Sequence, residues 1–140
     1  MEKLEKFSGK FSRSLAALKR NLDFFSTQIR ELDPVEEESK IAGTIKLLEL
    51  CYEMSWKFLQ QYLKQQYSIE LSSPKGIFRE CYAQKIIDFS MTEQLLAISE
   101  ARNATTHDYN EESAQEMYRR VTEYYHVFKF LESSLIKPRN

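Results

Sequence analysis

Eight consecutive residues in the C-terminal half of the chain combine side chains that could carry out chemistry. Residues 102–109 include an arginine, an asparagine, two threonines, one of the chain's two histidines, an aspartate and a tyrosine. A histidine titrates near neutrality and can move a proton in either direction. An arginine holds a phosphate with its planar guanidinium and stabilises the charge that builds up in phosphoryl transfer. The segment therefore predicts a site that acts on a phosphate group.

An arginine and a histidine without metal ligands suit one reaction in particular, the attack of an RNA 2′-hydroxyl on the adjacent phosphate. This reaction needs neither a hydrolytic water nor Mg²⁺, and it benefits from an acid and a base acting together. Each chain supplies one histidine here, His107. A two-fold dimer that joins two such segments would supply both groups, so the chemistry predicts a homodimer. The alternative is a helix corner, in which Arg102 and Asn103 cap carbonyl groups and His107 satisfies a backbone group.

Amphipathic helices must position this segment. Apolar residues three and four apart predict long helices over about residues 2–30 and 35–67. A short helix is expected over about residues 74–82, and a fourth helix from a capping box at Ser90 and Glu93 to about Arg102. A fifth is expected from Asn110 to Pro138. The pattern predicts one all-α domain over residues 1–140, an antiparallel four-helix bundle plus one short helix.

The second long helix is expected to be central. Its apolar residues form two stripes, which indicates neighbours on two sides. Gly43 lies within it, where glycine costs about 1 kcal/mol relative to alanine, so we expect a close helix crossing there. Trp56 is the only tryptophan and is expected to be an anchor in the core or at an interface.

Residues 102–109 bridge the fourth and fifth helices. In an unbroken helix Arg102 and His107 would lie about 140° apart, since each residue turns about 100°. Threonines are mediocre helix formers and often cap helices. We therefore expect a bend at Thr105 or Thr106 that brings the arginine and the histidine to one pocket.

The composition limits the classes of partner. Twenty basic and twenty-one acidic residues leave a net charge of −1. A strong non-specific grip on nucleic acid needs a broad basic surface, so we expect no DNA binding and only local contact with RNA. No apolar run approaches the roughly 18 residues of a membrane span, and the first ten residues lack the apolar core of a signal peptide. A cytoplasmic protein is the expectation.

The remaining candidate residues predict structural roles. Cys51 and Cys81 are isolated in apolar surroundings without metal-ligand spacing, which predicts buried, reduced thiols. His126 falls off the main apolar stripe of its helix and is expected at the surface. No metal site and no cofactor are predicted.

The motif formed by Arg102, His107 and Tyr109 resembles the R-x4-6-H signature of HEPN domains, in the R-x4-H-x-Y form of HepT-like toxins. Residues 52–59 resemble that family's E-x-S-W-K-x-L helix, and residues 73–80 its S-P-R-x-x-x-R-E segment. Residues 102–111 resemble its R-N-x-T-S-H-x-Y-x-E segment. The three blocks lie in order over most of the chain. They are most similar to the branch of nucleotidyltransferase substrate-binding proteins, which pairs with a separately encoded minimal nucleotidyltransferase.

The resemblance implies a helical bundle that forms a homodimer, with the two Arg–His segments facing each other. Arg102 and His107 would be the catalytic pair of a metal-independent endoribonuclease toxin that acts on RNA. Asn103 and Thr106 would bind the phosphate. Tyr109 would be the hydroxyl that the nucleotidyltransferase adenylylates to silence the toxin. The alternative is a non-catalytic substrate-binding subunit, which presents substrate or nucleotide to that partner.

Overall fold

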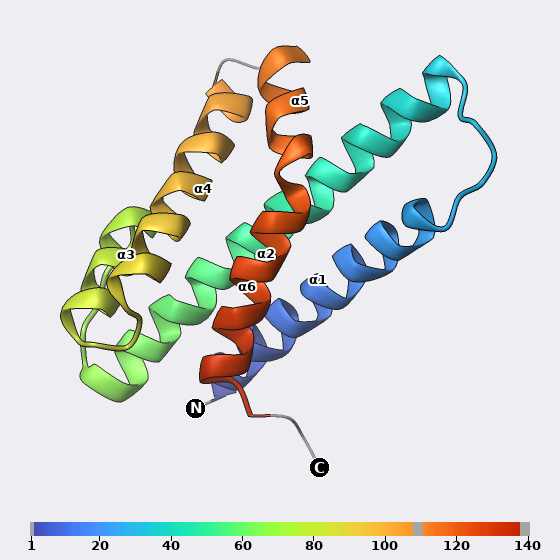
Figure 1. Cartoon of the computed structure of the whole chain (residues 1–140). Coiled ribbons are helices and arrows are strands. Elements are labelled where there is room, and N and C mark those ends of the chain that lie inside the picture. Colours follow the sequence, from blue (N-terminus) through green and yellow to red (C-terminus); the bar gives the residue numbers. More distant parts are fainter. Residues whose placement is uncertain (1, 108–110, 138–140) are drawn as a thin grey trace.

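The structure is a computed structural model that describes residues 2–107 and 111–137, and the elements found in this part of the chain are all α-helices. They are α1 (Glu2–Ser26), α2 (Pro34–Tyr67), α3 (Pro74–Ala83), α4 (Phe89–His107), α5 (Glu111–Arg119) and α6 (Val121–Leu135) (Figure 1). The predicted all-α bundle is confirmed. Of the described helices, none has the length and apolar character needed to span a membrane.

Helix α2 is the centre of the bundle, as predicted. It is 34 residues long and contacts each of the other described helices. Helices α1 and α2 form an antiparallel hairpin (Figure 1). Helix α4 and the α5–α6 pair pack beside this hairpin, and α3 lies near the C-terminal end of α2 (Figure 1). The core is aromatic at its middle, where the Phe11 ring lies 6.0 Å from that of Phe58 and 6.2 Å from that of Phe128.

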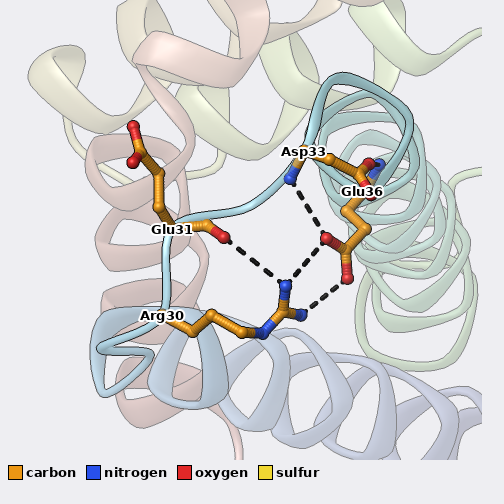
Figure 2. A network of polar contacts seen from close by, with 4 residues as sticks. All are labelled: Arg30, Glu31, Asp33 and Glu36. Carbon is orange, nitrogen blue, oxygen red and sulfur yellow. Dashed lines mark hydrogen bonds and ion pairs between the residues drawn. The ribbon is translucent and has the colours of Figure 1, made fainter.

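The connection between α1 and α2 is fixed by a polar network (Figure 2). Asp33 caps α2 by accepting a hydrogen bond from the Glu36 N–H at 2.8 Å, and the Glu36 carboxylate accepts one from the Asp33 N–H at 3.1 Å. Arg30 donates two hydrogen bonds to the same carboxylate, at 2.9 and 2.6 Å. Pro34 opens the helix with its φ already set. The first helix ends at Ser26, earlier than predicted, and leaves Arg30 available for this network.

The predicted capping box at Ser90 and Glu93 is wrong, because the helix begins earlier. Asp88 accepts a hydrogen bond from the Met91 N–H at 2.8 Å, and α4 starts at Phe89. Ser90 is already inside the first turn. Asp88 therefore caps the helix in place of Ser90, which lies two residues later.

The predicted fifth helix is two helices that meet at Arg120. The Arg120 N–H bonds to the Met117 carbonyl, three residues back, at 3.2 Å, which breaks the regular α-helical pattern. The break lets α5 pack against α2 and α4 while α6 runs beside α1 and α2 (Figure 1). Ion pairs from the Arg120 side chain to Glu116 and Glu123 span it.

Gly43 does not mark a helix crossing, so that prediction is wrong. The residue is exposed on α2, and a Cβ added there would meet no atom within 4 Å. The predictions for the two cysteines are confirmed. Cys51 and Cys81 are free and fully buried, and burial raises the pKa of each thiol to about 12.

Candidate functional site

A cleft of about 440 Å³ opens where α2, α3 and α4 meet. Each of these helices brings one of the three sequence blocks that resemble the HEPN family to this cleft. The lining residues are Tyr52, Glu53 and Trp56 of α2, Ser73, Pro74 and Lys75 at the start of α3, and Arg102 and Asn103 of α4. Segments far apart in the sequence thus form one site.

Arg102 is supported by an aromatic ring from another helix. Its guanidinium carbon lies 5.8 Å from the centre of the Tyr52 ring, which is within the range of a cation–π contact. Tyr52 is only 3% exposed, and its hydroxyl lies 2.8 Å from that of Ser99 on α4. The ring therefore cannot turn away without breaking a buried hydrogen bond. Helix α2 holds the arginine of α4 at the cleft.

The start of α3 forms a positive wall of the cleft. Ser73 caps the helix by accepting a hydrogen bond from the Gly76 N–H at 3.1 Å, and Pro74 occupies the first helical position. A Cβ on Gly76 would lie 2.6 Å from the Ser73 hydroxyl oxygen, so a side chain there would force this hydroxyl to shift. Helix N-termini carry partial positive charge. Lys75 adds a full charge and forms an ion pair with Glu100 of α4.

Trp56 forms the aromatic part of the wall. The side chain is half-buried, packs against the core and also lines the cleft, whereas its sequence predicted only an anchor. Lys57 lies 5.7 Å from the centre of the indole ring and pairs with Glu53 at 3.0 Å. Tyr52 and Lys75 were not among the residues predicted for the site. Their membership in the family blocks was the available signal.

The expected bend in α4 at Thr105 or Thr106 is absent, because the helix continues to His107. The Thr105 hydroxyl bonds to the Arg102 carbonyl at 2.9 Å within the same helix, and the side chain is buried against Met117 of α5. Arg102 and His107 therefore start from backbone positions about 140° apart.

Among the predicted site residues, Arg102 and Asn103 line the cleft together. Tyr109 lies outside the described residues, and for Thr106 and His107 the structure describes the backbone alone. His126 is exposed on α6, as predicted. In the part of the chain that the structure describes, no group of three or more His, Cys, Asp or Glu side chains could hold a metal ion.

Comparison with known proteins identifies the family of this chain. The sequence matches the family described as "nucleotidyltransferase substrate binding protein like" over residues 6–137. The crystal structure of a protein from Thermus thermophilus is similar, with a TM-score of 0.73 and 26% sequence identity. The alignment covers 91% of this chain and 99% of the Thermus chain. A comparison with curated proteins gives no match. The chain belongs to the nucleotidyltransferase substrate-binding protein-like family.

Proposed function

We propose that the chain is the binding partner of a nucleotidyltransferase and that the cleft holds a phosphate-bearing substrate of that enzyme. The observation that carries the proposal is the convergence of all three family blocks on one cleft. The family's name supports the partnership. Helix α4 runs unbroken from Arg102 to His107, so the two residues start from different sides of the helix. A binding role agrees with this arrangement, because it needs no histidine beside Arg102 in the cleft.

The electrostatics of the cleft support a phosphate ligand. Arg102 presents a planar set of N–H donors, which matches phosphate oxygens better than the ammonium group of a lysine does. Its contact with Tyr52 limits the side-chain freedom that binding would otherwise have to remove. Lys75 and the start of α3 add positive charge to the same cleft, while Glu53 in the lining and Glu100, which pairs with Lys75, add negative charge.

Co-expression with a nucleotidyltransferase encoded beside this gene tests this function. A small nucleotidyltransferase gene beside this one is expected, and the two proteins should co-purify. Nucleotide transfer by the pair should fall about ten-fold when Arg102 is replaced by alanine, because a charge-assisted contact to the substrate is lost. Lys129→Ala, which removes an exposed cation on α6, serves as the matched control. Two proteins that do not associate would refute the proposal.

The second candidate function is a metal-independent endoribonuclease toxin. Its supporting observation is that Arg102 and His107 both lie in the last two turns of α4, with the spacing of the HepT-like toxins. Two chains related by a two-fold axis would contribute two arginines and two histidines to one site. One histidine would accept the proton of the RNA 2′-hydroxyl as it attacks the phosphate. The other would donate a proton to the departing 5′-oxygen, leaving a 2′,3′-cyclic phosphate.

The toxin candidate has a direct test. Expression of the chain alone should arrest growth, and the purified, unmodified protein should cut RNA in the presence of EDTA. His107→Ala should abolish both effects, and light scattering should give the mass of a dimer. A wild-type chain that is harmless and leaves RNA intact removes this candidate, while the binding function stands.

Tyr109 is the proposed target of the partner enzyme in that second candidate. Its hydroxyl would attack the α-phosphate of ATP, forming an AMP ester and releasing pyrophosphate. The ester adds bulk and negative charge two residues from His107, where substrate phosphate would sit with help from Asn103 and Thr106. Mass spectrometry of the chain after incubation with active partner and ATP should find AMP on Tyr109, and Tyr109→Phe should remain unmodified.

A further inference from the structure

The cleft between α2, α3 and α4 is lined by chemically different groups. They include the cations of Lys75 and Arg102, the indole of Trp56 and the carboxylate of Glu53. We infer that the cleft binds a free nucleoside monophosphate, with the phosphate between Lys75 and Arg102 and the base against Trp56. This inference rests on the proposed function for the location of the substrate and goes further by naming its chemical class.

The two cations proposed to hold the phosphate come from two helices. Arg102 comes from α4 and Lys75 from the first turn of α3, close to the partial positive charge of that helix terminus. The Lys75 side chain is 34% exposed and the Arg102 side chain is half-buried. A phosphate in the cleft would thus be partly shielded from water, which strengthens its attraction to both cations.

The lining offers a base one aromatic side chain that is not deeply buried, Trp56. Tyr52 also lines the cleft, but it is only 3% exposed and carries the guanidinium of Arg102. Trp56 is more exposed as a residue than Tyr52, and the Lys57 ammonium group lies 5.7 Å from the centre of its ring. Stacking on an aromatic ring does not distinguish one base from another, because every base has a π-face. A volume of about 440 Å³ lies near the lower end of the range for small-ligand sites, which suits one nucleotide rather than a chain.

Glu100 competes with the ligand for Lys75. Its carboxylate forms an ion pair with the Lys75 ammonium group, and its side chain is 66% exposed. An arriving phosphate must share this ammonium group and also approach the carboxylate, which is repulsive. Removing the charge with Glu100→Gln should therefore tighten phosphate binding, whereas a purely structural role for the pair predicts no gain.

The chain supplies its own reporter, because Trp56 is its only tryptophan. Titration of the purified chain with AMP should change the indole fluorescence and saturate. Adenosine and inorganic phosphate should each bind about ten-fold or more weakly than AMP, since each keeps only half of the contacts. Lys75→Ala and Arg102→Ala should each weaken AMP binding about ten-fold. Glu100→Gln should tighten it about two- to five-fold.

Matched controls separate these effects from general charge changes. Lys129 and Glu132 form an ion pair on α6, away from the cleft lining, so Lys129→Ala and Glu132→Gln should leave AMP binding unchanged. The Trp56 variants lack the fluorescent reporter, so their AMP binding is measured by calorimetry. Trp56→Leu should bind AMP about ten-fold more weakly, and Trp56→Phe should recover most of the affinity. Circular dichroism checks that each variant retains its helices.

Four results would each overturn the assignment. They are the failure of AMP to bind at millimolar concentration, equal binding of AMP and inorganic phosphate, equal binding of AMP and adenosine, and an oligoribonucleotide that binds at least ten times more tightly than AMP. A chain that associates with its nucleotidyltransferase but binds no nucleotide would contradict this inference alone. A chain that binds AMP but never associates with the enzyme would contradict the proposed function alone.

Discussion

The Arg102 guanidinium lies 5.8 Å from the centre of the Tyr52 ring, and the Tyr52 hydroxyl lies 2.8 Å from that of Ser99, three residues before Arg102 on the same helix. Tyr52 therefore contacts α4 at two points, one on each of two successive turns. In this way Tyr52 both stabilises the packing of α2 on α4 and positions Arg102, the candidate phosphate-binding group.

Two substitutions at Tyr52 should separate the contribution of its hydroxyl to stability from the contribution of its ring to binding. Tyr52→Phe keeps the ring beneath Arg102 but leaves the buried Ser99 hydroxyl without its partner, so we expect about 1–2 kcal/mol of destabilisation with binding retained. Tyr52→Leu also removes the ring and should weaken AMP binding further. Urea denaturation measures the first effect and calorimetry the second. Equal binding by the phenylalanine and leucine variants would mean that the ring does not support the arginine.

Two glycines in helices should respond to alanine in opposite directions. Gly43→Ala should stabilise the protein by about 1 kcal/mol, because the site is exposed, helical and free of nearby atoms. Gly76→Ala should destabilise it slightly, because the new methyl group would displace the capping hydroxyl of Ser73, at a cost of up to about 2 kcal/mol that outweighs the gain of about 1 kcal/mol in helix propensity. Thermal unfolding of both variants provides the test. A stabilising Gly76→Ala would show that the cap at the cleft is dispensable.

The network at the start of α2 should weaken in acid. Hydrogen bonds from the Arg30 guanidinium, followed by the one from the Asp33 backbone, lower the pKa of Glu36 from 4.5 to about 2. A carboxylate with a lowered pKa in the folded state stabilises that state at pH values above its unfolded pKa. This contribution is lost as the pH falls from about 4.5 towards 2.

Glu36→Gln tests this dependence. The difference in melting temperature between the wild type and the variant should be present near neutrality and vanish towards pH 2. Arg30→Ala should return the pKa of Glu36 towards 4.5, which a carboxyl NMR titration can follow. Glu38 is an exposed carboxylate in the same region, and Glu38→Gln is the control. A difference that persists undiminished at pH 2 would contradict the assignment.

The cysteines should report unfolding. Cys51 and Cys81 are fully buried, and burial raises the pKa of each thiol to about 12, so the reactive thiolate is scarce and inaccessible in the native protein. Thiol reagents at about pH 8 should label both residues in urea and neither in buffer. Rapid labelling of the native chain, with its helical circular dichroism intact, would argue against the packing described for α2 and α3.

The sequence by itself determined the helices and several of their ends. An apolar residue every three or four positions can be buried only by a helix packed on a partner, and this signal does not depend on distant parts of the chain. The caps at Asp33 and Ser73 are local in the same way, because each side chain bonds to an N–H three residues later. The buried cysteines also followed from their apolar neighbours.

Local signals failed where tertiary contacts compete with them. The apolar stripe is continuous across Arg120, so nothing in the sequence predicted the break that lets α5 and α6 pack on different neighbours. Thr105 suggested a bend, yet burial against Met117 of α5 keeps it inside an unbroken helix. Gly43 suggested a crossing, but no neighbouring helix approaches it closely.

The candidate site shows the same division. The residue type of Arg102 predicted a phosphate site from the sequence alone, and the family resemblance added Asn103 to it. Their meeting with Trp56 of α2 and Lys75 of α3 was decided only by the tertiary structure. The reason is that side-chain chemistry is a property of each residue, whereas a cleft depends on how helices far apart in the chain cross. That crossing is set by the packing of their buried faces, to which Tyr52 is the cleft residue that contributes from the core.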